Sequence, residues 1–403
     1  MRGGCTFIRL LADGDKGAVL AASIDALRSG EGSSEVFSVD PEKFSMVPGS
    51  PFAYWVSDRI RQLFVDLPPF EGEGRTVKQG LATADDPRFV RTWWEVDPAS
   101  TVTGTAETTP DEFRAQTSAG KKWVPFAKGG EYSPYYADVH LVVNWGNDGE
   151  EIKKWVCGRY PYLKGNWGWV VKNTDYYFRS GLTWPGRPLK RGAFSYIPPG
   201  VIFSHGGMMI FAPQDQLWAL ISLLNTDAYI GLLHLLMPRG VGNTGATLKY
   251  EVGYIKSVPI PELPKDMLTQ LEDVSKRNWE LMRLLQTSDE LSYNYIQPAI
   301  TENKNLNLED SSEILDKLKL QKLNEMSENA TIANEIGFLR YELGPLERTC
   351  LCENIGKPLI PDSNSNEGSN GKTDSITAEL LSWCTGTIFG RWDIRYATGE
   401  RQP

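Results

Sequence analysis

A change of pattern at Pro264 places the strongest constraint on how this chain can fold. Before it, over residues 121–261, short runs of aromatic and β-branched residues are interrupted by Gly, Pro and Asn at intervals of roughly ten residues, which is typical of a mostly-β unit. After it, apolar residues repeat with alternating spacings of four and three, which indicates a long helix with a heptad-like seam. We therefore expect an α+β fold, in which a mixed, mostly-β domain is flanked by an N-terminal helical connector and a C-terminal helical hairpin.

Apolar periodicity and turn residues locate the individual elements. Helices are predicted over residues 18–28, 52–67, 214–224, 229–237 and 376–388. Strands are predicted over residues 138–145, 168–172, 176–178 and 200–203. The seam after Pro264 consists of Met267, Leu271, Val274, Asn278, Leu281 and Leu285. A second helical pattern over residues 311–343 is expected to fold back on this seam as an antiparallel partner, with Asn278 fixing the register of the two helices.

These elements divide the chain into five segments. Residues 1–118 are the connector, 119–262 the mostly-β domain, 263–361 a helical spacer with the hairpin, and 375–403 a C-terminal helical segment. Residues 362–374 are rich in Ser, Asn and Gly. They are predicted to form a flexible linker, because such a composition buries too little apolar surface to order the backbone.

The sequence offers little for catalysis or metal binding. Of the three histidines, His234 lies in an apolar helical pattern, where core packing is the simpler explanation, and none stands in a nucleophile, zinc-protease or phosphate-loop motif. Cys350 and Cys352 lack neighbouring Cys or His residues that would complete a tetrahedral zinc set. No catalytic, cofactor-binding or metal-binding residue is therefore assigned. The few scattered cysteines, and the lack of a signal peptide or a long apolar stretch, predict a cytoplasmic protein with no membrane partner.

The charge of the chain is unevenly distributed. Its net charge is −9, which by itself argues against a nucleic-acid partner. Residues 121–261, however, hold 15 Lys and Arg against 9 Asp and Glu, a local balance of +6 that leaves −15 for the rest of the chain. Because phosphate binding needs clustered cations, the mostly-β domain is the part suited to a nucleic acid.

Within this basic region, cationic side chains alternate with amide and aromatic ones. The cations are Lys128, Lys153, Lys154, Arg159, Lys164, Lys172, Arg179, Arg187, Lys190 and Arg191, and Asn166, Asn173, Tyr176 and Tyr177 lie among them. Lys and Arg bind phosphates, and Arg and Asn can also pair with base edges in the major groove. DNA contacts are predicted for Lys128, Lys172, Asn173, Tyr176, Arg179, Arg187, Lys190 and Arg191. Arg179 is assigned to a base and Lys128 to a phosphate, because the guanidinium fork suits guanine and the ammonium is a point charge.

Two other classes of function stay open at this point. Thirteen Trp residues are many. The rings of Trp145, Trp155, Trp167, Trp169 and Trp184 could stack on sugars, as in a carbohydrate-binding or carbohydrate-acting β-domain, on bases, or simply pack in the core. The predicted hairpin could instead belong to a structural or interaction protein. The salt dependence of binding distinguishes a DNA-binding domain from a carbohydrate-binding one, because DNA binding weakens steeply with salt and glycan binding does not.

Seven short segments point to a known family. They are residues 49–57 (GSPFAYWVS), 75–81 (RTVKQGL), 123–131 (WVPFAKGGE), 173–179 (NTDYYFR), 223–226 (LLNT), 250–253 (YEVG) and 259–261 (PIP). They resemble the PglX-type methyltransferases of BREX phage defence and the type IIG restriction-modification enzymes, which are adenine-specific DNA methyltransferases. The resemblance covers roughly residues 45–290 and, more faintly, residues 390–392 (GRW).

The resemblance implies that residues 119–262 are a target-recognition domain that binds double-stranded DNA. The step at residues 128–130 looks like the start of that domain, and its glycines would allow a tight turn or a close approach of the backbone to a ligand. Gly129 and Gly130 therefore join the predicted DNA contacts.

The catalytic motifs of the family have no counterpart here. Such enzymes hold S-adenosylmethionine with a Gly-rich loop and the flipped adenine with an Asn-Pro-Pro-Tyr type motif. Residues 67–70 (LPPF) lack the Asn, and residues 133–136 (SPYY) lack the Asn and the second Pro. In the family's order the catalytic domain precedes residue 1. We therefore expect a split or truncated gene product that aims a separate methyltransferase domain or subunit at one adenine, and that is inactive alone.

Because both motifs are missing, the purified chain is expected neither to bind S-adenosylmethionine nor to methylate DNA. Isothermal titration calorimetry checks the first part, with an adenine methyltransferase that contains both motifs as the positive control. Stoichiometric heat from cofactor binding to this chain would contradict the prediction.

Overall fold

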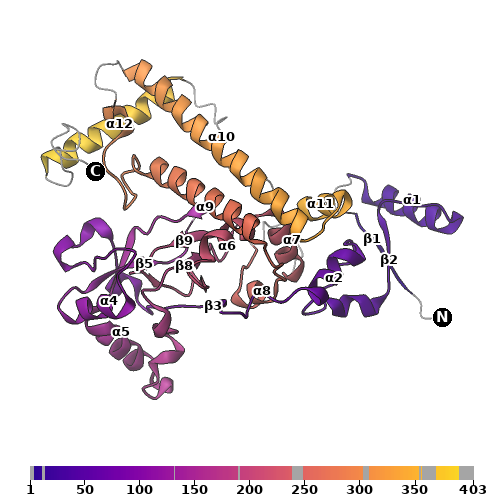
Figure 1. The fold of residues 1–403 in the computed structure, drawn as a ribbon, viewed down its shortest axis with the longest axis horizontal. Helices are drawn as coiled ribbons and strands as arrows, with labels where there is room; N and C mark the ends of the chain where they lie inside the picture. Colours follow the sequence, from indigo (N-terminus) through magenta and orange to yellow (C-terminus); the bar gives the residue numbers. More distant parts are fainter. Residues whose placement is uncertain are drawn as a thin grey trace.

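The computed structural model describes residues 4–10, 14–130, 132–188, 191–237, 248–302, 308–353, 355 and 369–389. Two mixed β-sheets lie at the centre of this part of the chain. Long helices rise from this centre, and a small N-terminal unit lies at the other end of the molecule (Figure 1).

The two central sheets are built from short strands. The first contains, in spatial order, β10 (Ile202–Phe203), β5 (Trp123–Ala127), β7 (Leu141–Asn144) and β4 (Val90–Thr92). The second contains β3 (Thr76–Lys78), β11 (Met209–Phe211), β8 (Gly181–Thr183), β9 (Ser195–Ile197) and β6 (Tyr135–Tyr136). Neighbouring strands are antiparallel, except that β5 runs parallel to β10 and β6 runs parallel to β9. A separate antiparallel pair, β1 (Cys5–Ile8) and β2 (Val36–Val39), belongs to the N-terminal unit.

Helices surround the sheets, and the two types of element together confirm the α+β class. The helices are α1 (Lys16–Ser29), α2 (Asp58–Asp66), α3 (Asp86–Phe89), α4 (Pro110–Ser118), α5 (Gly146–Arg159), α6 (Leu217–Leu224), α7 (Asp227–Leu236), α8 (Val252–Ser257), α9 (Lys265–Gln286), α10 (Leu308–Arg340), α11 (Pro345–Cys352) and α12 (Ser369–Ile388). Several begin at side-chain caps. Thr109, for example, forms a capping box with Glu112 at the start of α4.

The helices α6 and α7 are apolar on nearly all sides because they lie inside the main hydrophobic core. Among the described residues, no single helix is long and apolar enough to cross a membrane. The α6–α7 pair meets that test only when taken together, and it is bent by 70° between the two helices. Asn225 and Thr226 lie at the bend, and the Thr226 hydroxyl accepts the Tyr229 N–H as the cap of α7.

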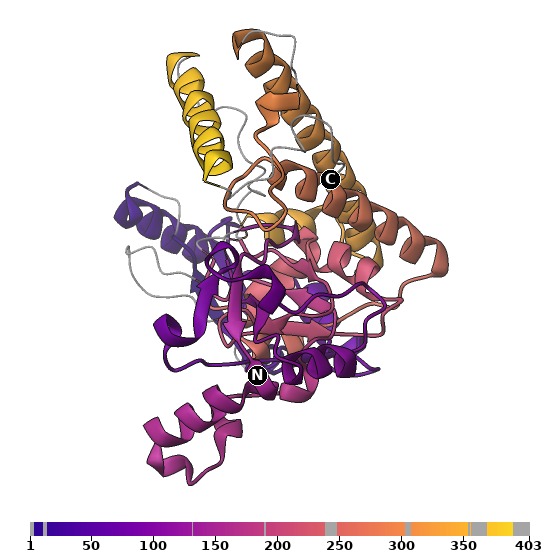
Figure 2. The same ribbon diagram turned by 90° about the vertical axis from the view of Figure 1, so that its left-hand side faces the viewer.

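The α9 and α10 helices form the predicted antiparallel hairpin, which rises from the sheets beside α12 (Figures 1 and 2). The seam residues Leu271, Val274, Asn278 and Leu281 are buried. Asn329 of α10 donates to the Oδ1 atom of Asn278 at 2.9 Å, so a polar pair lies within the apolar seam. Near the start of α9 the Glu262 carbonyl accepts from Arg340, and further along α9 Arg277 pairs with Glu325, so the two helices run in opposite directions.

The structure departs from the sequence prediction in one helix and two strands. The helix predicted over residues 52–67 begins only at Asp58, because Ser57 caps it and the preceding segment follows an irregular path. Residues 168–172 and 176–178 were expected to be strands but lie in and beside 3₁₀ turns at Trp167–Trp169 and Thr174–Tyr176. Asparagines decide this difference: the Asn166 side chain accepts the Gly168 N–H, and Asn173 adopts φ +54°.

Segment boundaries differ as well. The strands β3 and β4 come from residues before 119, so the segment expected to be a helical connector supplies one strand to each central sheet. The helix α12 begins at Ser369, inside the predicted linker 362–374. Residues 362–368, and the GRW segment at 390–392, lie outside the described residues.

Gly80 lies where the chain crosses β10 and leaves no room for a side chain. A Cβ atom at Gly80 would lie 2.0 Å from the carbonyl oxygen of Phe203, which already accepts the Leu81 N–H. Gly80→Ala is expected to lower the free energy of unfolding by about 1–3 kcal/mol or more, measured by urea denaturation. Gly158→Ala in α5, where nothing lies within 4 Å, is the control and should raise it by about 0.5–1 kcal/mol. Equal stability of the two variants would contradict the close approach of the Gly80 backbone to β10.

Candidate functional site

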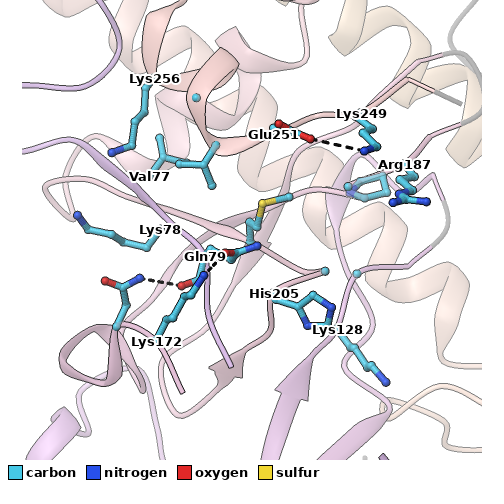
Figure 3. Close-up of a pocket in the computed structure, with 18 of the residues that line it drawn as sticks. Val77, Lys78, Gln79, Lys128, Lys172, Arg187, His205, Lys249, Glu251 and Lys256 are labelled. Carbon is cyan, nitrogen blue, oxygen red and sulfur yellow. Dashed lines mark hydrogen bonds and ion pairs between the residues drawn. The ribbon is translucent and has the colours of Figure 1, made fainter. Parts of the chain in front are cut away.

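A cavity of about 1020 Å³ opens between the two central sheets (Figure 3). Its walls are four loops that follow strands: those after β3, β5 and β8, and the one that joins β10 to β11. Because β5 and β10 are parallel, their carboxyl ends meet at the same edge, and the loops that leave them lie side by side. The segment 172–173 and the start of α8 complete the wall.

Glycines allow the loops after β5 and β10 to cross in backbone contact. Gly129 has φ +85°, and a Cβ atom there would lie 2.9 Å from the Gly206 carbonyl oxygen. A Cβ atom at Gly207 would lie 2.4 Å from the Gly129 nitrogen. Ser204 fixes the second loop, since its hydroxyl accepts the N–H groups of Gly206 and Gly207 at 3.1 and 2.8 Å. The crossing sets the shape of the cavity wall, and no larger residue fits there.

The cavity is strongly cationic. Six Lys or Arg residues line it, against one carboxylate, Glu251. The six are Lys78, Lys128, Lys172, Arg187, Lys249 and Lys256. They come from separate segments, and Figure 3 shows Lys78, Lys172 and Lys256 on one side of the cavity and Arg187 and Lys249 on the other.

Three of these cations have carboxylate partners. The pairs are Lys256 with Glu71 at 3.0 Å, Lys249 with Glu251 at 3.9 Å, and Lys128 with Asp86. Burial acts to raise the pKa of Asp86, but hydrogen bonds from Lys128 and Thr83 outweigh it and hold that pKa below its ordinary value. The Lys128 ammonium is thus paired with an ionised carboxylate.

Lys78, Lys172 and Arg187 differ, because none of them has a carboxylate partner among the described residues. The Lys172 ammonium donates to the neutral side-chain oxygen of Gln79 at 2.9 Å. The Asn173 amide donates to the Gln79 carbonyl at 2.7 Å, so the two residues hold this wall together. Three positive charges therefore face the cavity without local neutralisation, which favours an anionic ligand.

Tyr176 extends this charge beyond the cavity. Its ring packs on Phe211, with centroids 5.0 Å apart, and the cations of Lys78 and Arg179 each lie 5.1 Å from its centroid. The same ring therefore contacts one cation of the cavity, Lys78, and the exposed Arg179 of the chain's basic region.

Six of the ten residues predicted from the sequence line the cavity: Lys128, Gly129, Gly130, Lys172, Asn173 and Arg187. Tyr176 and Arg179 lie next to it, and Lys190 is outside the described residues. Lys78, Gln79, Lys249 and Lys256 line the same cavity but were not among the residues predicted from the sequence. Lys78 and Gln79 stand in the RTVKQGL segment, but only the pairing of β3 with β11 brings that segment to the basic domain.

Arg191 is a correction to the sequence prediction. It is 6% exposed, pairs with Asp227 at the start of α7, and donates to the Asn225 carbonyl at 2.8 Å. A buried guanidinium that is fully engaged in this way positions the chain before β9, and it is not available to DNA.

The five tryptophans singled out in the sequence do not form a sugar-binding row. Trp145 and Trp184 are buried in the core, and their indole N–H groups donate to Asp148 and to the Tyr250 carbonyl. Trp155 packs under Arg88 and Trp167 under Lys153, at 4.3 and 4.7 Å from cation to ring centroid. Of the five rings singled out in the sequence, only Trp169 is largely exposed, at 70%. Among the described residues no group of Cys, His, Asp and Glu could hold a metal ion.

Two curated proteins are related to this chain, although no family model matches it. The chain is 26% identical over 360 residues to the adenine-specific methyltransferase BrxX of Escherichia coli O9:H4 (strain HS), a match that covers 87% of this chain and 26% of that protein. It is 24% identical over 379 residues to the adenine-specific methyltransferase PglX of Lacticaseibacillus casei (strain Zhang), covering 91% of this chain and 29% of that protein. The chain is thus homologous to BrxX and PglX, and it spans between a quarter and a third of their length.

A solved structure is also similar. It is that of the Type IIL restriction-modification enzyme MmeI in complex with DNA, with a TM-score of 0.41 and 11% sequence identity. The match covers 77% of this chain and 36% of that one.

The pair of buried Arg191 and half-buried Asp227 tests whether Arg191 is structural or contacts DNA. Arg191→Ala leaves the half-buried Asp227 carboxylate without its cation and is expected to lower the free energy of unfolding by about 2–4 kcal/mol, measured by urea denaturation. Arg179→Ala removes an exposed cation and should change it by less than about 0.5 kcal/mol. An Arg191→Ala variant of unchanged stability would show that the structural role is wrong.

Proposed function

We propose that this chain, a homologue of adenine-specific methyltransferases over 87–91% of its length, is the DNA target-recognition part of such an enzyme. The observation that supports this most directly is the cationic cavity between the sheets. Six Lys or Arg residues line this cavity, although the net charge of the chain is −9. The amide side chains of Gln79 and Asn173 lie among them. Duplex DNA presents the two features that such a surface recognises, closely spaced phosphates and hydrogen-bonding base edges.

Different side chains suit the two tasks. Lys78 and Lys172 lack carboxylate partners among the described residues and are suited to phosphates, whereas Lys128 is already paired with Asp86. We therefore move the phosphate role from Lys128 to these two lysines. Arg179 keeps its assignment to a base edge, because its guanidinium is exposed and lies 5.1 Å from the centroid of the Tyr176 ring.

Methyl transfer itself is not assigned to residues of this chain. The sequence has no counterpart of the S-adenosylmethionine loop or of the Asn-Pro-Pro-Tyr type motif. In this proposal the chain binds the recognition site and a methyltransferase domain or subunit acts on the adenine. The phage-defence or restriction setting follows from the same homology.

The proposal predicts that Lys78→Ala/Lys172→Ala weakens DNA binding by the full-length chain. Fluorescence anisotropy with random-sequence duplex at several salt concentrations measures this. Each lost phosphate contact should lower the affinity for all sequences alike and reduce the slope of log affinity against log salt by about one unit. Lys317→Ala on α10, an exposed lysine paired with Glu313 and outside the cavity, is the matched control and should bind as the parent chain does.

The same titration, repeated with a duplex selected for binding, separates phosphate from base contacts. Arg179→Ala should weaken the free energy of binding to the selected duplex by about 1–3 kcal/mol and lower the preference for one base at one position of the site. Its effect on binding to random duplex should be small. Parent-like affinity of the lysine double variant on both duplexes would remove DNA recognition from this cavity.

A further inference from the structure

A basic and aromatic arm follows the first sheet. Between Glu151 and Asp175 the chain contains five Lys or Arg, five Trp or Tyr and no Asp or Glu. This stretch begins in α5, continues through 3₁₀ turns at Pro161–Leu163 and Trp167–Trp169, and ends at the cavity wall. In Figure 2, α5 and the turns after it (magenta) extend away from the body of the molecule. We call residues 150–171 the α5 arm.

Two aromatic side chains of the α5 arm are exposed. Tyr162 is 73% and Trp169 is 70% exposed, although Leu163 and Val171 of the same segment are buried in a hydrophobic core. Tyr and Trp combine a large apolar ring with a polar group and are suited to contact surfaces, so these two exposed rings are candidates for contact with a partner.

The backbone holds these rings in a defined place. Lys164 and Gly165 adopt φ +49° and +85°, and the Asn166 side chain caps the next turn by accepting the Gly168 N–H at 3.2 Å. The N–H groups of both Val170 and Val171 donate to the Trp167 carbonyl at 2.9 Å. The tip is therefore preorganised, which lowers the entropic cost of binding.

Charge indicates the partner. At the base of the α5 arm Lys153 is paired with Asp148 at 3.0 Å, and Lys154 is paired with Glu150. Arg159 and Lys164, nearer the tip, are exposed and belong to the stretch without carboxylates. Exposed rings next to cations match a nucleic acid, since rings stack on bases and cations contact phosphates.

The α5 arm is also continuous with the cavity. Val171 forms a β-bridge with Leu81, and the next two residues, Lys172 and Asn173, line the cavity wall. A DNA duplex seated at the cavity would therefore have the arm beside one flank.

We propose that the α5 arm is a second DNA-contacting surface, in which Tyr162 and Trp169 pack on deoxyribose rings of the backbone and Arg159 and Lys164 contact phosphates outside the recognition site. This inference rests on the proposed function of the cavity. It assigns to the chain a flank contact that adds affinity for any sequence, in addition to the contacts that read the site.

Paired substitutions in the full-length chain test the arm, with affinity for random duplex measured by fluorescence anisotropy. Tyr162→Ala/Trp169→Ala should weaken binding by about tenfold or more, and Tyr162→Phe/Trp169→Phe should retain most of the affinity because the rings remain. Arg159→Ala/Lys164→Ala should reduce the salt slope by about two units. Phe389→Ala, which removes a ring that is 84% exposed at the end of α12, is the control and should have no effect. Urea denaturation of each variant confirms folding, and all four positions in the arm are exposed.

The cavity variant Lys78→Ala/Lys172→Ala, measured in parallel, keeps the two hypotheses apart. If the cavity variant loses affinity while the ring-to-Ala variant binds like the parent chain, the arm is not a DNA contact and the proposed function stands. If the Phe variant is as weak as the Ala variant, stacking by the rings is wrong. If the parent chain itself does not bind duplex DNA, the proposed function fails and this inference fails with it.

Discussion

The break between α6 and α7 is the junction on which the rest of the structure depends. The Asn225 side chain accepts the Phe194 N–H and donates to the Phe194 carbonyl, both at 2.9 Å, which attaches the helix pair to the chain entering β9. Asp227 pairs with Arg191 on the sheet side, and its N–H donates to Asn334 of α10 at 2.7 Å. The polar residues at the break between α6 and α7 therefore connect the second sheet, the core helices and the hairpin. Buried polar groups are costly unless they are all paired, so this junction strongly favours one arrangement of the three parts.

The position of the second sheet in turn determines where the cavity lies. Its strands β3, β8 and β11 end or begin at the cavity, opposite the parallel ends of β5 and β10 in the first sheet. The loops at these ends bring together lysines that are far apart in the sequence, such as Lys78, Lys172 and Lys256. A cluster of like charges opposes its own formation, and here the buried sheets and helices around it supply the stability that compensates for the repulsion. Such a cluster attracts anionic partners even though the whole chain is acidic.

Patterns that depend on neighbouring residues were predictable from the sequence. The heptad seam of α9, the two core helices and the break at residues 225–226 follow from periodicity and capping, and the structure confirms them. The turns at Trp167–Trp169 and Thr174–Tyr176 were missed because aromatic and β-branched composition favours strands, whereas the asparagines before each turn decide its backbone conformation. Arg191 was predicted to contact DNA because its neighbours in the sequence are basic and polar. Its actual partners, Asn225 and Asp227, lie 34 and 36 residues later in the chain.

The sequence by itself determined the class of fold, the core helices α6 and α7, the long helices α9 and α10, the basic character of residues 121–261 and the resemblance to adenine-specific methyltransferases, because each of these is a property of local composition and order. Only the tertiary structure decided which cations share a cavity, which are neutralised by carboxylates and which aromatic rings reach the surface. Lys128 and Lys172 look alike in the sequence, yet one is paired with Asp86 and the other contacts a neutral amide. The electrostatic energy of a charge depends on the distances to its neighbours, and those distances exist only once strands remote in sequence have paired.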